Sequence, residues 1–165
     1  MVLGDRIPAD FRRMYEVHDY RHAAAILAGA FTTEPKGICV ALRSFNFTEE
    51  EVERPGGNES DIPKRFSQLL RSAGWKSVNL TARRTVDDRT VTEETQEIDY
   101  VKGPVALDLE WNSKDQTFDR DLQAFRAFFE CDKISVGVLI TRSNELDPWF
   151  DSLGTYRDKH DDMRT

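Results

Sequence analysis

The sequence is poor in cysteine and histidine and contains no long apolar run. Its 165 residues include two cysteines and three histidines, and Cys39 and Cys131 both lie in apolar contexts. We therefore expect two reduced core thiols, not a disulfide or a metal site. No stretch approaches the roughly 20 apolar residues of a membrane span, and residues 1–16 lack the basic-then-apolar order of a signal peptide. These absences predict a cytoplasmic protein with no membrane partner.

Basic side chains are also in deficit. There are 23 Lys and Arg residues against 30 Asp and Glu residues, which gives a formal net charge of −7. Binding to nucleic acid usually needs a basic surface, so the total charge argues against such a partner. It does not exclude one, because basic groups can line a cleft while acids cover the remaining surface. A cluster of acids whose true partner is a cation would also make the count more negative.

What the sequence does contain is enough apolar material for one folded domain. Hydrophobic residues make up 39% of the chain and include 10 Phe and 3 Trp, so we expect a single globular domain over residues 1–165. Residues from about 145 to 165 are expected to form a mobile or truncated tail. Helical patterns cover Val17–Phe31 and residues 35–45, 48–57 and 62–73, with Gly74 as the stop of the last one.

From Lys76 onward the pattern changes to β-structure. Two runs of strand character flank a turn at Asp87–Asp88, and a strand at Val105–Trp111 is followed by a helix over residues 117–130. The apolar face of this helix is predicted to contain Phe118, Leu122, Phe125, Phe128 and Phe129. The β-branched run at Ile134–Ile140 indicates a strand buried on both faces and parallel to Val105–Trp111. The fold class is therefore α/β, with a mixed sheet, an antiparallel hairpin and helices around it.

The segment "ALDLEWNSKD" (residues 106–115) places acids at alternate positions of an otherwise apolar strand. Gly103–Pro104 is a turn signal, and a hairpin centred there puts Asp99 opposite Asp108. Opposite side chains lie roughly 5 Å apart in a sheet. One face of the hairpin then carries Glu97, Asp99, Asp108, Glu110 and Asn112. The other face carries Ile98, Tyr100, Leu107, Leu109 and Trp111.

Acids so close together repel one another and raise each other's pKa unless a cation neutralises them. A cluster of oxygens with no Cys or His nearby suits a hard ion, above all Mg²⁺, which commonly serves phosphate chemistry. The simpler interpretation is a solvated sheet face with ordinary surface acids. Asp is depleted in strands, so four acids next to a long apolar run favour the metal site.

Asp99 followed by Asp108-Leu109-Glu110 resembles the acid pattern of the PD-(D/E)xK nucleases. With it, "IDYVKGPVALDLEWNSKD", "FDRDLQAFR", "GVLITRS" and the upstream "GGNESDI" together resemble the restriction endonuclease family typified by the BglII enzyme, over residues 18–143. The resemblance implies a restriction-endonuclease-like mixed sheet with an active-site hairpin. It further implies a Mg²⁺-dependent type II endodeoxyribonuclease that hydrolyses phosphodiester bonds in a short sequence of double-stranded DNA, as a homodimer.

The resemblance also implies roles for individual acids. Asp99 and Asp108 would bind Mg²⁺, and Glu110 stands at the third position, where many members of the superfamily have Lys. The group that deprotonates the attacking water is then either Lys114 or a second metal-bound water. An alternative alignment takes residues 110–112 as the acid triplet. In both alignments Asp99, Asp108 and Glu110 line the catalytic site.

DNA recognition is expected from two segments. Asn112 and Ser113 follow the catalytic strand, where the family reaches base edges, although they could equally form a polar turn that caps the next helix. Arg142, Ser143 and Asn144 end the buried parallel strand, on the side where α/β sites usually lie. The alternative for Arg142 is a simple ion pair at a strand end.

Three further expectations stay open at this level. Glu59 is a candidate auxiliary metal acid, because some relatives of this fold carry one on an N-terminal helix. Arg120 and its neighbour Asp121 are expected to orient the site or to pair internally. The runner-up function is a catalytically inactive or non-specific DNA-binding domain that retains the nuclease fold.

Overall fold

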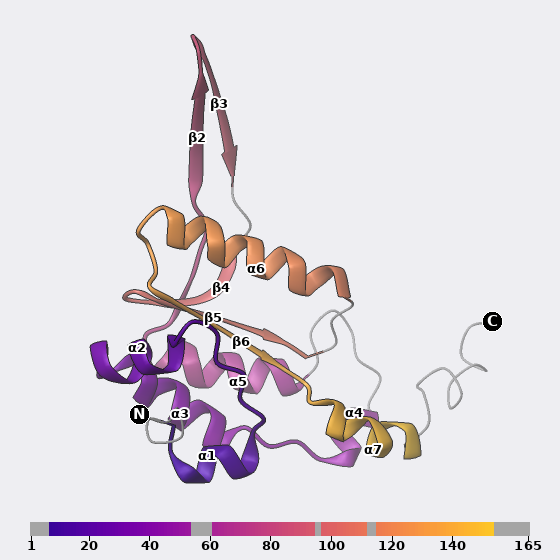
Figure 1. Ribbon diagram of the computed structural model, residues 1–165. Helices are drawn as coiled ribbons and strands as arrows, with labels where there is room; N and C mark the ends of the chain where they lie inside the picture. The colour runs from indigo at the N-terminus through magenta and orange to yellow at the C-terminus, as the bar shows by residue number, and fades with distance from the viewer. Residues whose placement is uncertain (1–6, 54–60, 95–96, 112–114, 154–165) are drawn as a thin grey trace, which may run out of the picture.

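The computed structural model describes residues 7–53, 61–94, 97–111 and 115–153, which form a four-stranded sheet with helices on both faces (Figure 1). The sheet order is β1–β4–β5–β6, with strands at Lys76–Val78, Ile98–Lys102, Val105–Glu110 and Val136–Thr141. β6 runs parallel to β5, and the other neighbours are antiparallel. The predicted α/β class and the mixed sheet are confirmed.

The helices lie in two layers. α6 (Asp115–Glu130) covers one face of the sheet, whereas α3 (Glu34–Ser44) and α5 (Asp61–Ser72) lie on the other (Figure 1). The remaining N-terminal helices are α1 (Ala9–Met14), α2 (Ala23–Ala30) and α4 (Glu49–Glu53). Within the described ranges no single helix is long and apolar enough to cross a membrane. Taken together, α2 and α3 have the length and composition of a membrane span, but the chain bends by 111° between them.

The start of the predicted helix at Val17–Phe31 is wrong. The helix begins at Ala23, because Arg21 and His22 have φ values of 52° and 63°, which lie outside the helical region. The Oδ1 of Asp19 accepts a hydrogen bond from the Ala24 N–H at 3.0 Å, so the chain turns into the helix through a side-chain contact. An alanine-rich pattern cannot reveal such a local turn.

The register of the central strands follows the expected pairing from Tyr100 to Lys102 of β4. In the β4–β5 hairpin Tyr100 pairs with Leu107 and Lys102 with Val105, and Gly103 in the turn has a φ of 51°. The parallel pair β5–β6 runs from Val105 opposite Val136 to Glu110 opposite Thr141. The acid-bearing strand is therefore held on both sides by hydrogen-bonded neighbours.

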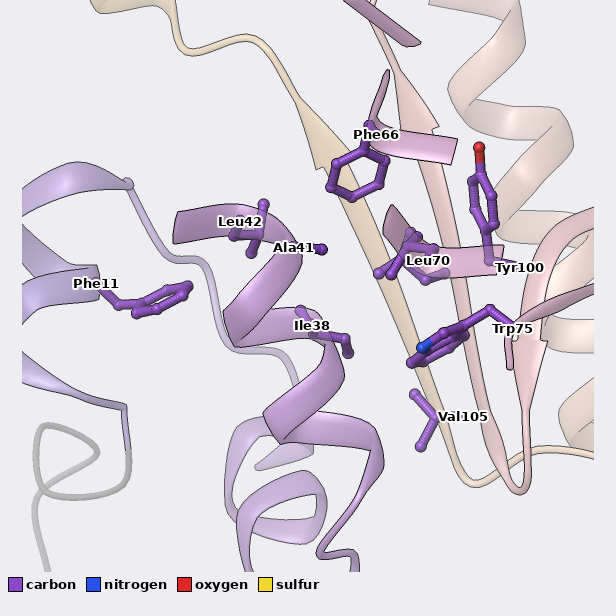
Figure 2. Packing of buried hydrophobic residues seen from close by; sticks show 10 residues of the cluster. Phe11, Ile38, Ala41, Leu42, Phe66, Leu70, Trp75, Tyr100 and Val105 are labelled. Atoms are coloured by element: carbon purple, nitrogen blue, oxygen red, sulfur yellow. The ribbon is translucent and has the colours of Figure 1, made fainter. Parts of the chain in front are cut away.

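The core on the α3–α5 side is built from aromatic and aliphatic side chains of both layers. Figure 2 shows Phe66, Leu70 and Trp75 packed against Tyr100 and Val105 of the sheet, and all five are buried. This face of β4 and β5 is the apolar face that the sequence predicts. Its burial prevents a one-residue slip of β5, because a slip would bring the acids into the core.

The core on the α6 side differs from the prediction in two respects. Ile98 lies with Ala124, Phe125 and Phe128 of α6 and not on the Tyr100 face. The cause is a register shift in the β1–β4 pair, where Lys76 faces Val101 but Val78 faces Ile98, so β4 has one residue more than β1 between these pairs. This irregularity falls at Asp99–Tyr100.

The buried stripe of α6 is also narrower than predicted. Phe125 and Phe128 are buried, but Leu122 and Phe129 are 53% and 59% exposed and face outward. The close approach of α6 to the sheet depends on Gly137 of β6. A Cβ at this position would lie 2.7 Å from Cδ2 of Phe125, so only glycine fits there without a shift.

Two strands lie outside this layered body. β2 (Thr81–Val86) and β3 (Arg89–Glu94) pair only with each other and project from the body as a hairpin (Figure 1), with the predicted turn at Asp87–Asp88. At the C-terminal side of β6, η2 (Asn144–Leu146) and α7 (Asp147–Ser152) follow. The last part of the predicted tail, residues 154–165, lies outside the described residues.

Candidate active site

Asp108 is the most buried acid of the hairpin, with 4% of its surface exposed. Its Oδ1 accepts a hydrogen bond from the backbone N–H of Asp99 at 2.8 Å, at the point where the β1–β4 register shifts. Its Oδ2 is buried and has no hydrogen-bond partner among the described residues. Burial raises the pKa of Asp108 to about 7, and the neighbouring charges of Asp99 and Asp121 add to this effect.

Asp99 and Glu110 stand on either side of Asp108. Asp99 is exposed at the rim of the site. Desolvation by the surrounding protein nevertheless raises the pKa of Asp99, and the charge of Glu97 raises it further. Glu110 is half-buried, and its pKa is raised to about 7, first by burial and then by its hydrogen bond to Asp121. The three acids thus share a site in which full ionisation is costly without a cation.

α6 adds the acidic residue Asp121 and the positively charged residue Arg120 to this site. Asp121 is 3% exposed, and its Oδ1 lies 3.4 Å from Nε of Arg120. The Oδ2 of Asp121 is buried without a hydrogen-bond partner among the described residues. Arg120 is half exposed, and its Nη2 lies 3.9 Å from Oε1 of Glu110. Four carboxyl groups and one guanidinium group therefore meet between β4, β5 and the first turns of α6.

A comparison with known protein families identifies the family of this chain. The family model described as "Restriction endonuclease BglII/BglIII" matches residues 15–164. The chain belongs to the BglII restriction endonuclease family. None of the curated proteins compared with the chain matches it. As a member of this family the chain is an endodeoxyribonuclease whose substrate is DNA.

Restriction endonucleases generally use a divalent metal ion, and the acid cluster can be tested for its fit to one. Over the described parts of the chain, no three Asp, Glu, His or Cys side chains already converge around one ion position. The donor chemistry nevertheless fits a hard cation, because Asp108 and Asp121 each have a buried carboxylate oxygen to which none of the described residues donates a hydrogen bond.

Several residues expected at the site of this endonuclease lie outside the described residues. They are Glu59, Asn112, Ser113 and Lys114. The end of β5 just before residues 112–114 is held by aromatic packing. Trp111 packs edge-on against Phe45 and Phe47, with ring centroids 5.9 Å and 4.6 Å apart. This aromatic contact fixes the direction in which the chain leaves Glu110.

The three residues that follow β6 lie in different environments; they are Arg142, Ser143 and Asn144. The guanidinium carbon of Arg142 lies 4.4 Å from the ring centroid of Phe150, so this arginine stacks on an aromatic ring. No ion pair of Arg142 is found within the described ranges. The Oγ of Ser143 accepts from the Glu145 N–H at 3.2 Å and donates to Glu16 at 3.1 Å, which gives this serine a capping role. Asn144 is exposed.

Arg142 and Asn144 line a pocket together with Glu110, which is the one acid of the site found in its lining. This pocket has a volume of about 380 Å³, and its lining also contains Trp111, Phe118, Thr141 and Asp147. The structure therefore brings the end of β6 next to the end of β5, as expected for a parallel pair.

Asp121 is the site residue that sequence reasoning placed only in a supporting role. A signal for it exists in the pattern of α6, since Asp121 is one helical turn from Ala124 and Phe125 on the buried face. A buried acid on an apolar helix face is costly and so indicates a specific partner. The expected pairing of Arg120 within this segment is confirmed by its contacts with Asp121 and Glu110.

Proposed function

We propose that the chain is a Mg²⁺-dependent type II restriction endonuclease that cleaves a short, specific sequence of duplex DNA at the Asp99–Asp108–Glu110 cluster. The observation that carries the proposal is the buried Asp108. Its Oδ1 accepts a hydrogen bond from the Asp99 N–H, and its Oδ2, beside other acids, has no hydrogen-bond partner in the part of the chain that the structure describes. A carboxylate in this position costs free energy in the empty site and gains a partner when a dication binds.

In this proposal Asp99 and Asp108 hold the metal ion. When bound, Mg²⁺ would polarise a phosphoryl oxygen, lower the pKa of an attacking water and stabilise the leaving oxygen. Glu110 lies beside them and would orient the attacking water. Its proton would pass to Lys114 or to a second water that the metal ion holds. Arg120, half exposed next to Glu110, supplies positive charge where the negative phosphate approaches.

Sequence recognition is proposed to come from the two strand ends that border the pocket. Asn112 and Ser113 follow β5, and Arg142 and Asn144 follow β6. Arg and Asn can both make paired hydrogen bonds to base edges in the major groove. Stacking on Phe150 limits the rotamers of Arg142 and leaves its N–H groups available to a base. Ser143 contributes by capping η2, so its effect on recognition is proposed to be indirect.

We also propose that the single domain of residues 1–165 works as a homodimer. Leu122 and Phe129 lie seven residues apart on the outer face of α6, and both are more than half exposed. Residues at this spacing lie on one stripe of a helix and can pack against the same stripe of a second helix. A two-fold dimer would present two acid clusters to the two strands of a palindromic site.

The test is cleavage of plasmid DNA of mixed sequence, followed by sequencing of the ends. Discrete ends within one short sequence in Mg²⁺, absent in EDTA and absent for Asp108→Asn, are the expected result. Ends spread over all sequences would overturn the specificity, and cleavage that persists in EDTA would overturn the metal dependence. A protein that binds DNA in Ca²⁺ but leaves it intact in Mg²⁺ and Mn²⁺ would overturn the assignment of activity to this cluster.

A further inference from the structure

Asp121 is a buried acid that no part of the proposed chemistry yet uses. It sits in the second turn of α6, is 3% exposed, and faces the sheet with Ala124 and Phe125. Asp119, two residues earlier on the same helix, is exposed. Of these two carboxylates, Asp119 faces solvent and Asp121 faces the acid cluster, and only Asp121 carries the cost of desolvation.

The two oxygens of Asp121 differ in their surroundings. Oδ1 lies 3.4 Å from both Nε and Nη2 of Arg120, which is a weak charged contact. Oδ2 is buried and has no hydrogen-bond partner among the described residues. A buried carboxylate oxygen without a partner is rare and costs free energy. The contact with Arg120 accounts for Oδ1, and Glu110 can hydrogen-bond with Asp121 only when these two carboxyl groups share a proton.

The same arrangement occurs on the opposite element. Asp108 of β5 uses Oδ1 for the Asp99 N–H and keeps a buried Oδ2 without a partner. Glu110, also on β5, is close enough to Asp121 to hydrogen-bond with it. Two unsatisfied oxygens, one from a strand and one from a helix, are thus found in one acid site. A single hard cation would give both of them a partner.

We infer that Asp121 is a further ligand of the divalent cation, with its Oδ2 facing the same ion as Oδ2 of Asp108. The inference rests on the proposed metal dependence and adds a helix-borne ligand to the acids of the hairpin. Because Asp121 comes from α6, the cation joins this helix to the sheet. Arg120 lies beside the other oxygen of Asp121, and its positive charge opposes that of the cation.

The experiment titrates the DNA-free protein with Mn²⁺ and follows free Mn²⁺ by electron paramagnetic resonance. Asp121→Asn keeps an oxygen for Arg120 and removes the charge, and we expect it to weaken Mn²⁺ binding by about tenfold or more. Asp119→Asn is the matched control, with the same charge change on the same helix at an exposed position, and it should stay within about twofold of wild type. Arg120→Gln removes a nearby positive charge and should bind Mn²⁺ at least as tightly as wild type.

The outcomes separate this inference from the proposed function. Unchanged affinity in Asp121→Asn together with weakened affinity in Asp108→Asn would overturn the role of Asp121 and leave the metal site standing. Unchanged affinity in both variants would overturn the metal site itself. Equal weakening in Asp121→Asn and Arg120→Gln would show that Asp121 acts only through Arg120, which also overturns the inference.

A crystallographic measurement covers the case in which Asp121→Asn does not fold. Wild-type crystals soaked in Mn²⁺ would show the ion by its anomalous scattering. A peak about 2.1 Å from Oδ2 of Asp121, the usual distance for such an ion, supports the inference. A peak coordinated by Asp108 but out of contact with Asp121 overturns it.

Discussion

Asp108→Asn should change the pH dependence of stability in the metal-free protein. The pKa of Asp108 is raised from 3.8 to about 7. This is a difference of about three pH units, each worth about 1.36 kcal/mol. A carboxyl group with a higher pKa in the folded state binds its proton more tightly there. Its contribution to stability is complete below about pH 4 and is lost as the pH rises through about 7.

The expected magnitude follows from that difference. By pH 8 the wild-type protein should have lost up to about 4 kcal/mol through Asp108 alone. Asparagine cannot ionise, and its Oδ1 can still accept the Asp99 N–H. Asp108→Asn should therefore match wild type near pH 4 and become more stable than wild type as the pH rises. Glu110 titrates in both proteins, but the charge of Asp108 also raises the pKa of Glu110, so the difference between the two proteins reports Asp108 together with its effect on Glu110.

The assay is urea unfolding in EDTA at several pH values between 4 and 8, with Asp119→Asn as an exposed control that should change stability by less than about 0.5 kcal/mol. Added Mg²⁺ should stabilise wild type more than Asp108→Asn, since only the wild-type site gains a carboxylate ligand. A stability difference between the two proteins that is the same at pH 4 and pH 8 would refute the reasoning.

Three further predictions concern recognition, packing and assembly. Arg142→Ala should weaken binding to the cognate sequence in Ca²⁺ by about 1–3 kcal/mol more than binding to random DNA; equal losses in a salt titration would make it a positioning residue. Trp111→Ala should lower the unfolding free energy by about 3–5 kcal/mol, because its ring packs against Phe45 and Phe47; urea unfolding measures this, and a loss below about 1 kcal/mol would contradict it. Phe129→Glu should give a folded monomer in sedimentation experiments, and an unchanged dimer would exclude this face of α6.

The central sheet could be predicted because its strands have strong and separate signals. Alternating apolar residues fix the register of Tyr100 opposite Leu107, and the β-branched run at Ile134–Ile140 correctly predicts a strand parallel to β5. The predicted burial of that strand on both faces is wrong, because β6 lies at the edge of the sheet and only Val136 in it is buried. The proximity of Asp99 and Asp108 follows from that register and the turn at Gly103. These features depend on local pattern and on the period of a strand, which the sequence contains directly.

The remaining features depend on contacts between distant segments. The irregular β1–β4 pairing, which turns Ile98 toward α6, depends on β1 and leaves no trace in the pattern of β4. The exposure of Leu122 depends on the angle at which α6 meets the sheet, and that angle is set by the close packing of Phe125 on Gly137. The position of Asp121 depends on the same packing, so its place beside Glu110 could not be predicted from periodicity alone.

The projecting β2–β3 hairpin leaves the body and returns to it between two strands that already pair. Val78 and Ile98 are Cα partners, so the two ends of the intervening segment stay about 5 Å apart whatever its length. Insertions between fixed ends add little loop-closure entropy. The segment can therefore lengthen, shorten or change its sequence without moving Asp99, one residue beyond it. In evolution this hairpin can diverge at its own rate while the catalytic sheet beside it stays constrained.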